Sequence, residues 1–296
     1  MAPGVKAIIV DNASTDGTLE QVRAWSQGRG NVRLVANPTN RGFAAAANQA
    51  VREADDARFL LLLNPDVCLL TGLDVLVSAS RQYGIAAGKL VDQQSHTQAG
   101  FTVRRLPTPA SLILETLGIN WLWPGNPVNR MYRELDRDLN QAGAAEQPAG
   151  AFLMFRRDVW ENLGGFDEQF FPVWFEDVDF CRRAVNAGHA IRYEPEAVAS
   201  HKGGHSVGKI PAGRRTAYWC ASLLKYAGKH FRPWAFKGIC AAVVLGSVPR
   251  MAAAVISERS LSPLNGYLRT MRFAGICLLL PGHIVREYVK KGTGIS

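Results

Sequence analysis

Residues 58–66 read Arg-Phe-Leu-Leu-Leu-Leu-Asn-Pro-Asp, an apolar run that ends in a polar turn. A short run of consecutive apolar residues predicts a strand buried on both faces, as in a sheet covered by helices. A second apolar run, Val5–Val10, also ends in a polar turn, which begins at Asp11. Ligands of such sheets gather at the carboxyl ends of the strands. We therefore expect Asp11 and Asp66 at a ligand-binding edge.

Predicted strands and helices alternate along this part of the chain. Between the two apolar runs, the pattern predicts helices at Leu19–Trp25 and Phe43–Glu53 and a strand at Val32–Val35. This alternation favours an α/β fold with a mostly parallel, Rossmann-like sheet flanked by helices. Residues 95–147 are predicted to form a long irregular connection close to the substrate. The elements expected after it are a strand at 150–155, helices at 158–163 and 176–187, and a strand at 190–193.

The charge of the chain is distributed unevenly. The 296 residues, 47% of them hydrophobic, are enough for one large domain or two small ones, and the net charge is +9. Residues 1–201 hold 19 Lys and Arg against 23 Asp and Glu, net −4, whereas residues 202–296 hold 15 against 2, net +13. A basic tail on a nearly neutral body indicates that the tail meets an anionic surface.

The basic tail is also apolar, in two runs at residues 236–255 and 273–285. Lys237, Pro249 and Arg250 interrupt the first run, so its uninterrupted stretches are shorter than the ~20 residues of a membrane-spanning helix. Short, basic and apolar stretches favour helices that lie in the membrane interface. The alternative is core helices that cap the catalytic domain. Nucleic acid is another anionic partner of basic tails, but this chain has no recognisable nucleic-acid-binding motif.

Five scattered cysteines, with no C-x-x-C pair, argue against a disulfide framework or a structural zinc site and favour a reducing compartment. The first residues, MAPGVKAIIVDNAS, lead straight into a predicted strand and show no secretory signal. Both observations favour a cytoplasmic location.

Several polar residues are candidates for a site. Asp66, at a strand end, can hold a divalent cation, which takes oxygen ligands from protein, phosphate and water; the alternative is an Asx turn. Asp11 stands where a nucleotide base or ribose binds, or else in a turn. Asn40-Arg41-Gly42 offers a guanidinium and a close backbone to a diphosphate, or is a solvated loop.

The segment Glu176-Asp177-Val178-Asp179 begins a predicted helix directly after Trp174 and Phe175. Aromatic neighbours raise the pKa of a carboxyl, and a helix amino terminus lowers it, which is how a general base is tuned. We expect Asp177 to be functional and Asp179 to be structural, paired with Arg182 or Arg183. The alternative is that all three acids cap the helix. His201, in a glycine-rich loop, can bind a metal or a diphosphate, whereas His205 is expected to be solvated.

In this order the segments resemble the inverting family 2 glycosyltransferases of GT-A fold, and within them the bacterial rhamnosyltransferase-like branch. The resemblance covers residues 5–206. The segments that carry it are Val10–Thr18, Asn40–Phe43 with Asn48, Leu63–Asp66, Gly150–Phe152, Gly164–Phe171, Glu176–Arg183 and His201.

The resemblance implies a role for each matching position. Donor binding falls to Asp11, Asn40, Arg41, Gly42, Asn64 and Asp66, and acceptor binding to Phe152, Trp174 and Glu176. Asp66 and His201 are the implied ligands of Mg²⁺ or Mn²⁺, and Asp177 is the implied catalytic base. The implied substrates are a nucleotide sugar, with dTDP-rhamnose the first guess, and a lipid-linked or polysaccharide acceptor at the inner face of the bacterial membrane. Whether the protein forms a homodimer is left open by the resemblance.

The resemblance also implies a domain division and a gap. Residues 1–206 correspond to the transferase domain, and residues 207–296 to a helical, membrane-associated region. Members of the family usually begin with another strand and helix, and that strand lies centrally in the sheet. No counterpart precedes Val5, so the domain is expected to be shortened and its sheet to carry an unpaired gap. A catalytically impaired scaffold is the alternative function.

Overall fold

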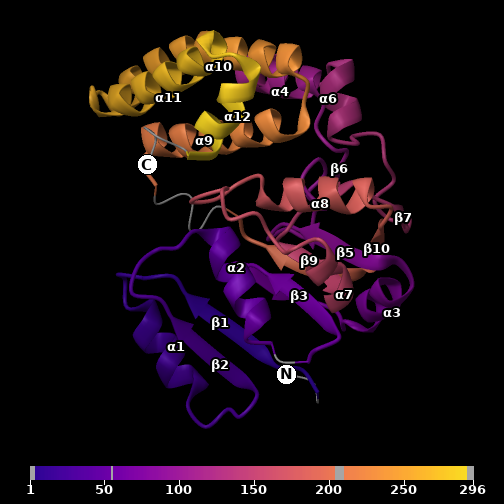
Figure 1. Ribbon diagram of the computed structural model, residues 1–296. Helices are drawn as coiled ribbons and strands as arrows, with labels where there is room; N and C mark the ends of the chain where they lie inside the picture. Colours follow the sequence, from indigo (N-terminus) through magenta and orange to yellow (C-terminus); the bar gives the residue numbers. More distant parts are fainter. Residues whose placement is uncertain (1–3, 55, 204–209, 292–296) are drawn as a thin grey trace.

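The computed structural model describes residues 4–54, 56–203 and 210–291. Figure 1 shows a sheet region that carries the amino terminus and a layer of long helices that carries the carboxyl terminus. Helix α8 (Glu176–Asn186) lies between them, over the sheet. The α/β class and the helical carboxyl-terminal region are confirmed.

The first two strands form a small parallel sheet of their own. β1 (Ala7–Asp11) pairs with β2 (Val32–Ala36) in a register that runs from Ala7 opposite Val32 to Asp11 opposite Ala36. Helices α1 (Thr18–Ser26) and α2 (Phe43–Arg52) follow the two strands. Apolar side chains of α2, among them Ala44 and Ala47, are buried and face the core.

The main sheet is mixed rather than mostly parallel. Its strand order is β3 (Phe59–Leu63), β9 (Phe152–Arg156), β5 (Gly84–Val91), β10 (Ala190–His201) and β4 (Val67–Leu69), with β7 (Gly143–Ala144) also on β10. Only the β5–β10 pairing is parallel within this sheet. The prediction of a parallel sheet was wrong here because β9 arrives after a long connection and enters between β3 and β5 in the opposite direction.

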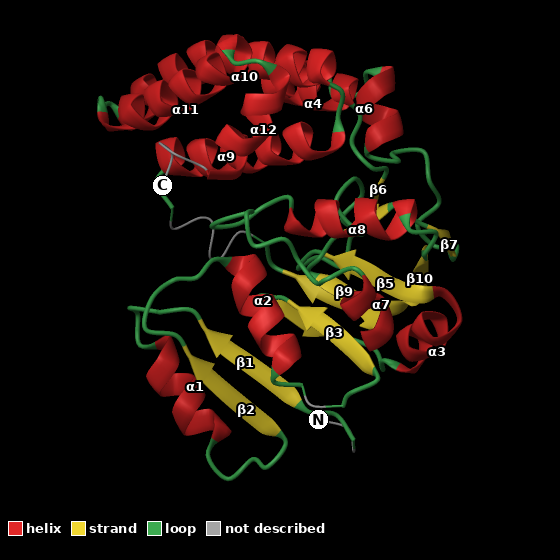
Figure 2. Ribbon diagram, in the orientation of Figure 1, coloured by secondary structure: helices red, strands yellow, loops and turns green. Residues whose placement is uncertain are grey.

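The two sheets are separated by the expected gap. In the described part of the chain, no ladder joins β1 to β3, although Figure 2 shows the two strands as neighbours. Ile8 and Ile9 of β1 and Leu62 of β3 line one common cavity. All three side chains are only half-buried, so each strand presents an apolar, unpaired edge to this space.

The region between residues 95 and 147 is more regular than its sequence indicated. It contains β6 (Val103–Arg104), α4 (Pro109–Leu117), α5 (Ile119–Leu122) and α6 (Pro127–Tyr132), and β6 pairs with β8 (Gln147–Pro148). The missed signal is a capping box: the Thr108 hydroxyl accepts from the Ser111 backbone N–H, and the Ser111 hydroxyl accepts from that of Thr108. α4 is then fixed by burial of Leu112 and Thr116.

Two smaller helices complete the sheet region. α3 (Asp74–Tyr83) packs against β5 and β10, and α7 (Arg157–Asn162) directly follows β9. Both helices flank strands whose buried side chains, among them Leu90 of β5 and Phe155 of β9, belong to the core of this region.

Four helices form the carboxyl-terminal lobe: α9 (Ala212–His230), α10 (Pro233–Glu258), α11 (Ser262–Leu279) and α12 (Gly282–Lys291). Their common core includes Leu223, Tyr226, Val243 and Phe273, all of them buried. α10 packs closely on α4 at Gly246. A side chain at this position would come within 2.1 Å of the Thr116 carbonyl oxygen, so the close approach requires glycine.

α10 is one continuous helix of 26 residues, with Pro249 inside it. The prediction that its apolar stretches are too short to span a membrane was wrong, because the proline does not end the helix. By length and composition, α10 is the one helix of the described residues able to cross a membrane. Its buried residues are Ala235, Phe236, Ile239, Cys240, Ala242, Val243, Gly246 and Ser247.

Candidate functional site

The carboxyl ends of β1, β3 and β10 and the amino end of α8 border one large cleft of about 1950 Å³. Side chains from α4, α6 and α9 form its other wall. The cleft continues the gap between β1 and β3. Eight of the residues predicted for the site line it: Asp11, Asn40, Asn64, Asp66, Trp174, Glu176, Asp177 and His201.

Asp66 and His201 are brought together by the pairing of β4 with β10. His201 lies opposite Val67 in this antiparallel ladder, and the Lys202 backbone N–H donates to the Asp66 carbonyl oxygen at 3.1 Å. The Asp66 Oδ2 and His201 Nε2 atoms are 3.7 Å apart, and both side chains are nearly buried. The two groups therefore face one another at the floor of the cleft.

The His201 ring is held in a fixed orientation. Its Nδ1 lies 3.0 Å from Gln98 Oε1, while Gln98 Nε2 donates to the His201 carbonyl oxygen at 2.9 Å. Phe101 stacks on the ring, with centroids 5.0 Å apart. When Nδ1 donates to Gln98, Nε2 presents its lone pair towards Asp66.

This arrangement fits a divalent cation that is shared with a substrate. The described residues contain no group of three or more His, Cys, Asp or Glu side chains arranged for a metal. A carboxylate and an oriented imidazole can hold Mg²⁺ or Mn²⁺ when phosphate oxygens and water supply the remaining ligands. The assignment of Asp66 and His201 as metal ligands stays a prediction.

The amino end of α8 is built on an unusual backbone. Trp174 and Phe175 have φ angles of 76° and 69°, a left-handed conformation that is costly for large side chains. These two residues turn the chain sharply into the helix. The turn presents Asp177 to the cleft one residue after the helix begins.

Two backbone N–H groups hold the Asp177 carboxylate. Gly150 donates to Oδ2 at 3.0 Å, and Val178 donates to Oδ1 at 2.8 Å. A side chain at residue 150 would come within 2.8 Å of the Asp177 Cβ, so the close approach requires glycine. The carboxylate keeps further lone pairs for a proton from a ligand.

Glu176 differs from its neighbour. Burial, and then the charge of Asp177, raise the pKa of the Glu176 carboxyl well above its ordinary value. Its Oε2 atom is buried without a hydrogen-bond partner among the described residues. Glu176 therefore holds its proton more strongly than an ordinary glutamate, and it lines the cleft beside Asp177.

Asp179 points the other way, into the protein. It is fully buried and accepts from Arg183 Nε at 2.7 Å, with Lys229 Nζ at 2.8 Å and His230 Nε2 at 2.7 Å. Although burial raises its pKa, the hydrogen bond to His230 and the charges of Arg183 and Lys229 lower it to about 2. The predicted pairing with Arg183 is confirmed, and Asp179 joins α8 to α9.

The polar loops beyond β1 and β2 join one another. The Asp11 carboxylate accepts from the Ser14 backbone N–H at 3.2 Å. Asn12 Nδ2 donates to Asn40 Oδ1 at 2.9 Å. Asp11 and Asn40 line the cleft, which places them at the end of it bordered by β1.

Three predicted site residues lie elsewhere. The Arg41 side chain is exposed and does not line the cleft. Gly42 is needed for packing, because a side chain there would come within 2.8 Å of the Phe171 ring. Phe152 is 1% exposed, in the core, so it does not contact an acceptor. Phe152 directly follows Gly150-Ala151, which line the cleft. Side chains alternate between the two faces of β9, however, and the ring of Phe152 lies on the face that packs into the core. His205 lies outside the described residues.

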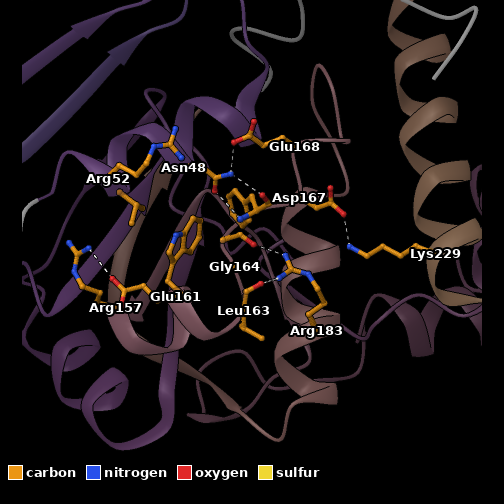
Figure 3. A pocket seen from close by; sticks show the side chains of 14 residues that line it. Asn48, Arg52, Arg157, Glu161, Leu163, Gly164, Asp167, Glu168, Arg183 and Lys229 are labelled. Atoms are coloured by element: carbon orange, nitrogen blue, oxygen red, sulfur yellow. Dashed lines mark hydrogen bonds and ion pairs between the residues drawn. The ribbon is translucent and has the colours of Figure 1, made fainter. Parts of the chain in front are cut away.

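A second hollow, of about 680 Å³, lies on another side of the sheet region (Figure 3). Asn48 ties its rim together: it accepts from the Phe166 backbone N–H and donates to the Phe166 carbonyl oxygen and Glu168 Oε1, each at 2.9 Å. Arg183 donates to the carbonyl oxygen of Gly165 at 2.7 Å, and Lys229 pairs with Asp167 at 2.6 Å. The segment Gly164–Phe171 is thus a structural junction of α2, α8 and α9.

Sequence reasoning missed one residue that lines the cleft, Arg104, and one that supports a lining residue, Gln98. Gln98, which orients His201, stands in a segment without any motif. Arg104 ends the two-residue strand β6 and lines the cleft beside Tyr132. No pattern distinguishes it in sequence from its neighbour Arg105.

The chain matches the family model of glycosyl transferase family 2 over residues 2–164, more than half of its length. It is 29% identical over 247 residues to the N-acetylglucosaminyl-diphospho-decaprenol L-rhamnosyltransferase of Mycobacterium tuberculosis (strain H37Rv), covering 78% of this chain and 77% of that protein. It is 28% identical over 173 residues to Rhamnosyltransferase WbbL of Escherichia coli (strain K12), covering 56% of this chain and 60% of that protein.

Solved structures show a more distant likeness. The mannosyltransferase PcManGT of Pyrobaculum calidifontis, in complex with GDP-Man and Mn²⁺, has a TM-score of 0.46 and 18% identity, with 98% of this chain and 76% of that chain covered. GalNAc-T7 with UDP, GalNAc and Mn²⁺ has a TM-score of 0.49 and 12% identity, with 76% and 45% covered.

Proposed function

The chain belongs to glycosyl transferase family 2 and is a glycosyltransferase, and from this premise we propose that it transfers rhamnose from a nucleoside diphosphate to a hydroxyl of a lipid-linked or cell-surface polysaccharide acceptor. The observation that supports this proposal best is the single cleft that contains Asp11, Asp66, His201 and Asp177. Both rhamnosyltransferases described above are relatives over more than half of this chain.

In the proposed reaction, Asp177 accepts the proton of the acceptor hydroxyl. The hydroxyl oxygen attacks the anomeric carbon from the face opposite the nucleoside diphosphate. The new glycosidic bond forms as the bond to the diphosphate oxygen breaks, so the configuration inverts and the diphosphate leaves with the bonding electrons. The backbone N–H groups of Gly150 and Val178 hold the base in place.

The other residues of the cleft bind and orient. Asp11 is assigned to the nucleoside, and Asn40 and Asn64 to the diphosphate. A divalent cation held by Asp66 and His201 would offset the negative charge of the diphosphate. Glu176 and Trp174, which line the cleft beside Asp177, are assigned to the acceptor sugar.

We expect dTDP-rhamnose to raise the melting temperature of the protein only when Mn²⁺ or Mg²⁺ is present. A ligand that binds the folded state alone stabilises it by about 2.7 kcal/mol at 100 times its dissociation constant. Asp66→Ala should abolish the metal-dependent part of this shift, and Asp56→Ala, an exposed acid outside the cleft, should retain it. Other nucleotide sugars, tested in parallel, identify the donor.

The same screen separates active enzyme from a donor-binding scaffold. Transfer to a lipid-linked acceptor, or slow hydrolysis of the donor, supports the enzyme. Stabilisation by a nucleotide sugar without either reaction would favour the scaffold, in which the gap between β1 and β3 leaves the nucleotide end of the cleft incomplete.

The helical lobe supports a peripheral position on an anionic membrane. Large apolar side chains are exposed on α5, where Trp121 is 82% exposed, directly after it, where Trp123 is 60% exposed, and on α10, where Leu245 and Ile256 are exposed. Residues 202–296 carry 15 basic against 2 acidic side chains, which complements anionic lipid. Because one face of α10 is buried against α4, α9 and α11, the helix lies in the interface rather than across the bilayer.

We expect phosphatidylglycerol vesicles with brominated acyl chains to quench the tryptophan fluorescence of the protein. Trp121→Phe with Trp123→Phe should remove most of the quenching, whereas Trp25→Phe should not, because Trp25 lies on α1 at the other end of the molecule. Phosphatidylcholine vesicles should bind at least about tenfold more weakly, since each basic residue near an anionic surface contributes ~1 kcal/mol and two of them already account for that factor. Equal binding to both lipids, or no quenching, contradicts the proposed membrane position.

A further inference from the structure

Arg104 stands in the wall of the cleft, and no acidic side chain of the described residues pairs with it. Its Nε atom is buried and makes no hydrogen bond among the described residues. The guanidinium lies over two aromatic rings, 5.9 Å from the centre of Phe101 and 6.0 Å from that of Tyr132. By contrast, Arg133 in the same wall is paired with Glu115 at 3.2 Å.

Arg104 also lies next to a ring that contacts His201, one of the proposed metal ligands. Phe101, the ring beneath its guanidinium, stacks on His201 with an interplanar angle of 6°. The charge of Arg104 reaches Cys181, one turn beyond Asp177 in α8. Burial raises the pKa of this thiol most, Asp177 raises it further, and Arg104 lowers it.

An unpaired cation in a partly buried wall is costly, and aromatic faces offset only part of this cost. The planar guanidinium presents several N–H donors in a fork that matches the oxygen atoms of a phosphate. An anion that entered the cleft would therefore supply the guanidinium of Arg104 with the partner that it lacks among the described residues. Substrates of the proposed reaction carry phosphate, either in the donor or in a lipid-diphosphate acceptor.

We propose that Arg104 binds a phosphate group of a substrate in this cleft. The inference rests on the proposed function, because the transfer reaction is what brings a diphosphate to this position. Arg104 is thus a binding residue that the chain adds to the predicted set of Asp11, Asn40, Asn64 and Asp66.

The test is the affinity for two diphosphates, measured by titration calorimetry. The probes are dTDP with Mn²⁺, for the donor side, and geranyl diphosphate, for the acceptor side. Arg104→Ala should weaken binding of one probe by about tenfold or more, the usual loss for a hydrogen bond to a charged group. Weaker dTDP binding assigns Arg104 to the donor, and weaker geranyl diphosphate binding assigns it to the acceptor.

The neighbouring residue gives a matched control. Arg105 is exposed, pairs with Glu134 at 3.8 Å and does not line the cleft, so Arg105→Ala should bind both probes like the unchanged protein. Arg104→Lys keeps the charge without the fork and should lose a smaller factor. It also guards against misfolding of the alanine variant, whose melting temperature is recorded alongside.

Equal affinities in the unchanged protein and Arg104→Ala, or no binding of either probe by the unchanged protein, would overturn the inference. So would a shifted pH profile of turnover with unchanged affinities, because Arg104 would then act on Asp177 instead. Binding needs no turnover, so Arg104-dependent diphosphate binding without sugar transfer would contradict the proposed function and leave this inference standing.

Discussion

Replacing Asp177 with Asn is expected to lower the turnover number by about 100-fold or more while the donor still binds. General-base catalysis contributes typically 10²–10⁴-fold, and an amide cannot accept the proton of the acceptor hydroxyl. The side chain of Asn has nearly the same shape, so Trp174 and Phe175 need not rearrange before α8. The measurement is turnover under donor and acceptor saturation, with the donor affinity determined separately by thermal shift.

A matched control and two contrary outcomes define the role of Asp177. Asp56→Asn, at an exposed acid outside the cleft, should leave turnover unchanged. Equal turnover in Asp177→Asn would remove Asp177 from the mechanism. A raised KM with unchanged kcat would instead mean that the residue only binds the acceptor.

The cleft was predictable where it follows from a general rule. Asp11 and Asp66 stand at strand ends, and ligands of α/β sheets gather there. Asp177 was singled out because it follows two aromatic residues at the predicted start of a helix. The structure brings Asp66, His201 and Asp177 into one cleft, as their proposed roles require.

The predictions that were wrong concern features that depend on contacts between segments far apart in the sequence. The direction of β9 between β3 and β5 is set by pairing partners that lie 66 to 97 residues away. No local pattern encodes that choice, so the sheet was expected to be mostly parallel. Phe152 was assigned to the acceptor for the same reason: whether its ring faces the cleft or the core depends on which face of β9 is covered.

Gln98 and Arg104 show a different limit. Each acquires its role from one neighbour brought by the fold, His201 for Gln98 and the ring of Phe101 for Arg104. A single glutamine or arginine in an irregular stretch carries no periodicity or spacing. Such residues become visible only when burial and missing partners can be examined in three dimensions.

The second large effect concerns stability. We expect Asp179→Ala to lower the free energy of unfolding by about 3–5 kcal/mol, the usual loss when one partner of a buried ion pair is removed. The change leaves Arg183, Lys229 and His230 close together without their common carboxylate. Because these residues belong to α8 and α9, the loss also loosens the contact of the sheet region with the helical lobe. Urea unfolding measures the difference.

The pH dependence of the same group provides an independent check. The pKa of Asp179 is about 2 in the folded protein and 3.8 ordinarily, so the folded state releases this proton more readily than the unfolded chain. The stabilisation is therefore complete above about pH 4 and is lost as the pH falls through 2. Asp179→Ala should show less acid destabilisation over this range than the unchanged protein. Asp167→Asn, which removes the charge of a half-buried partner of Lys229, should cost clearly less. An equal cost, or an Asp179→Ala loss below about 1 kcal/mol, would show that Asp179 does not organise this junction.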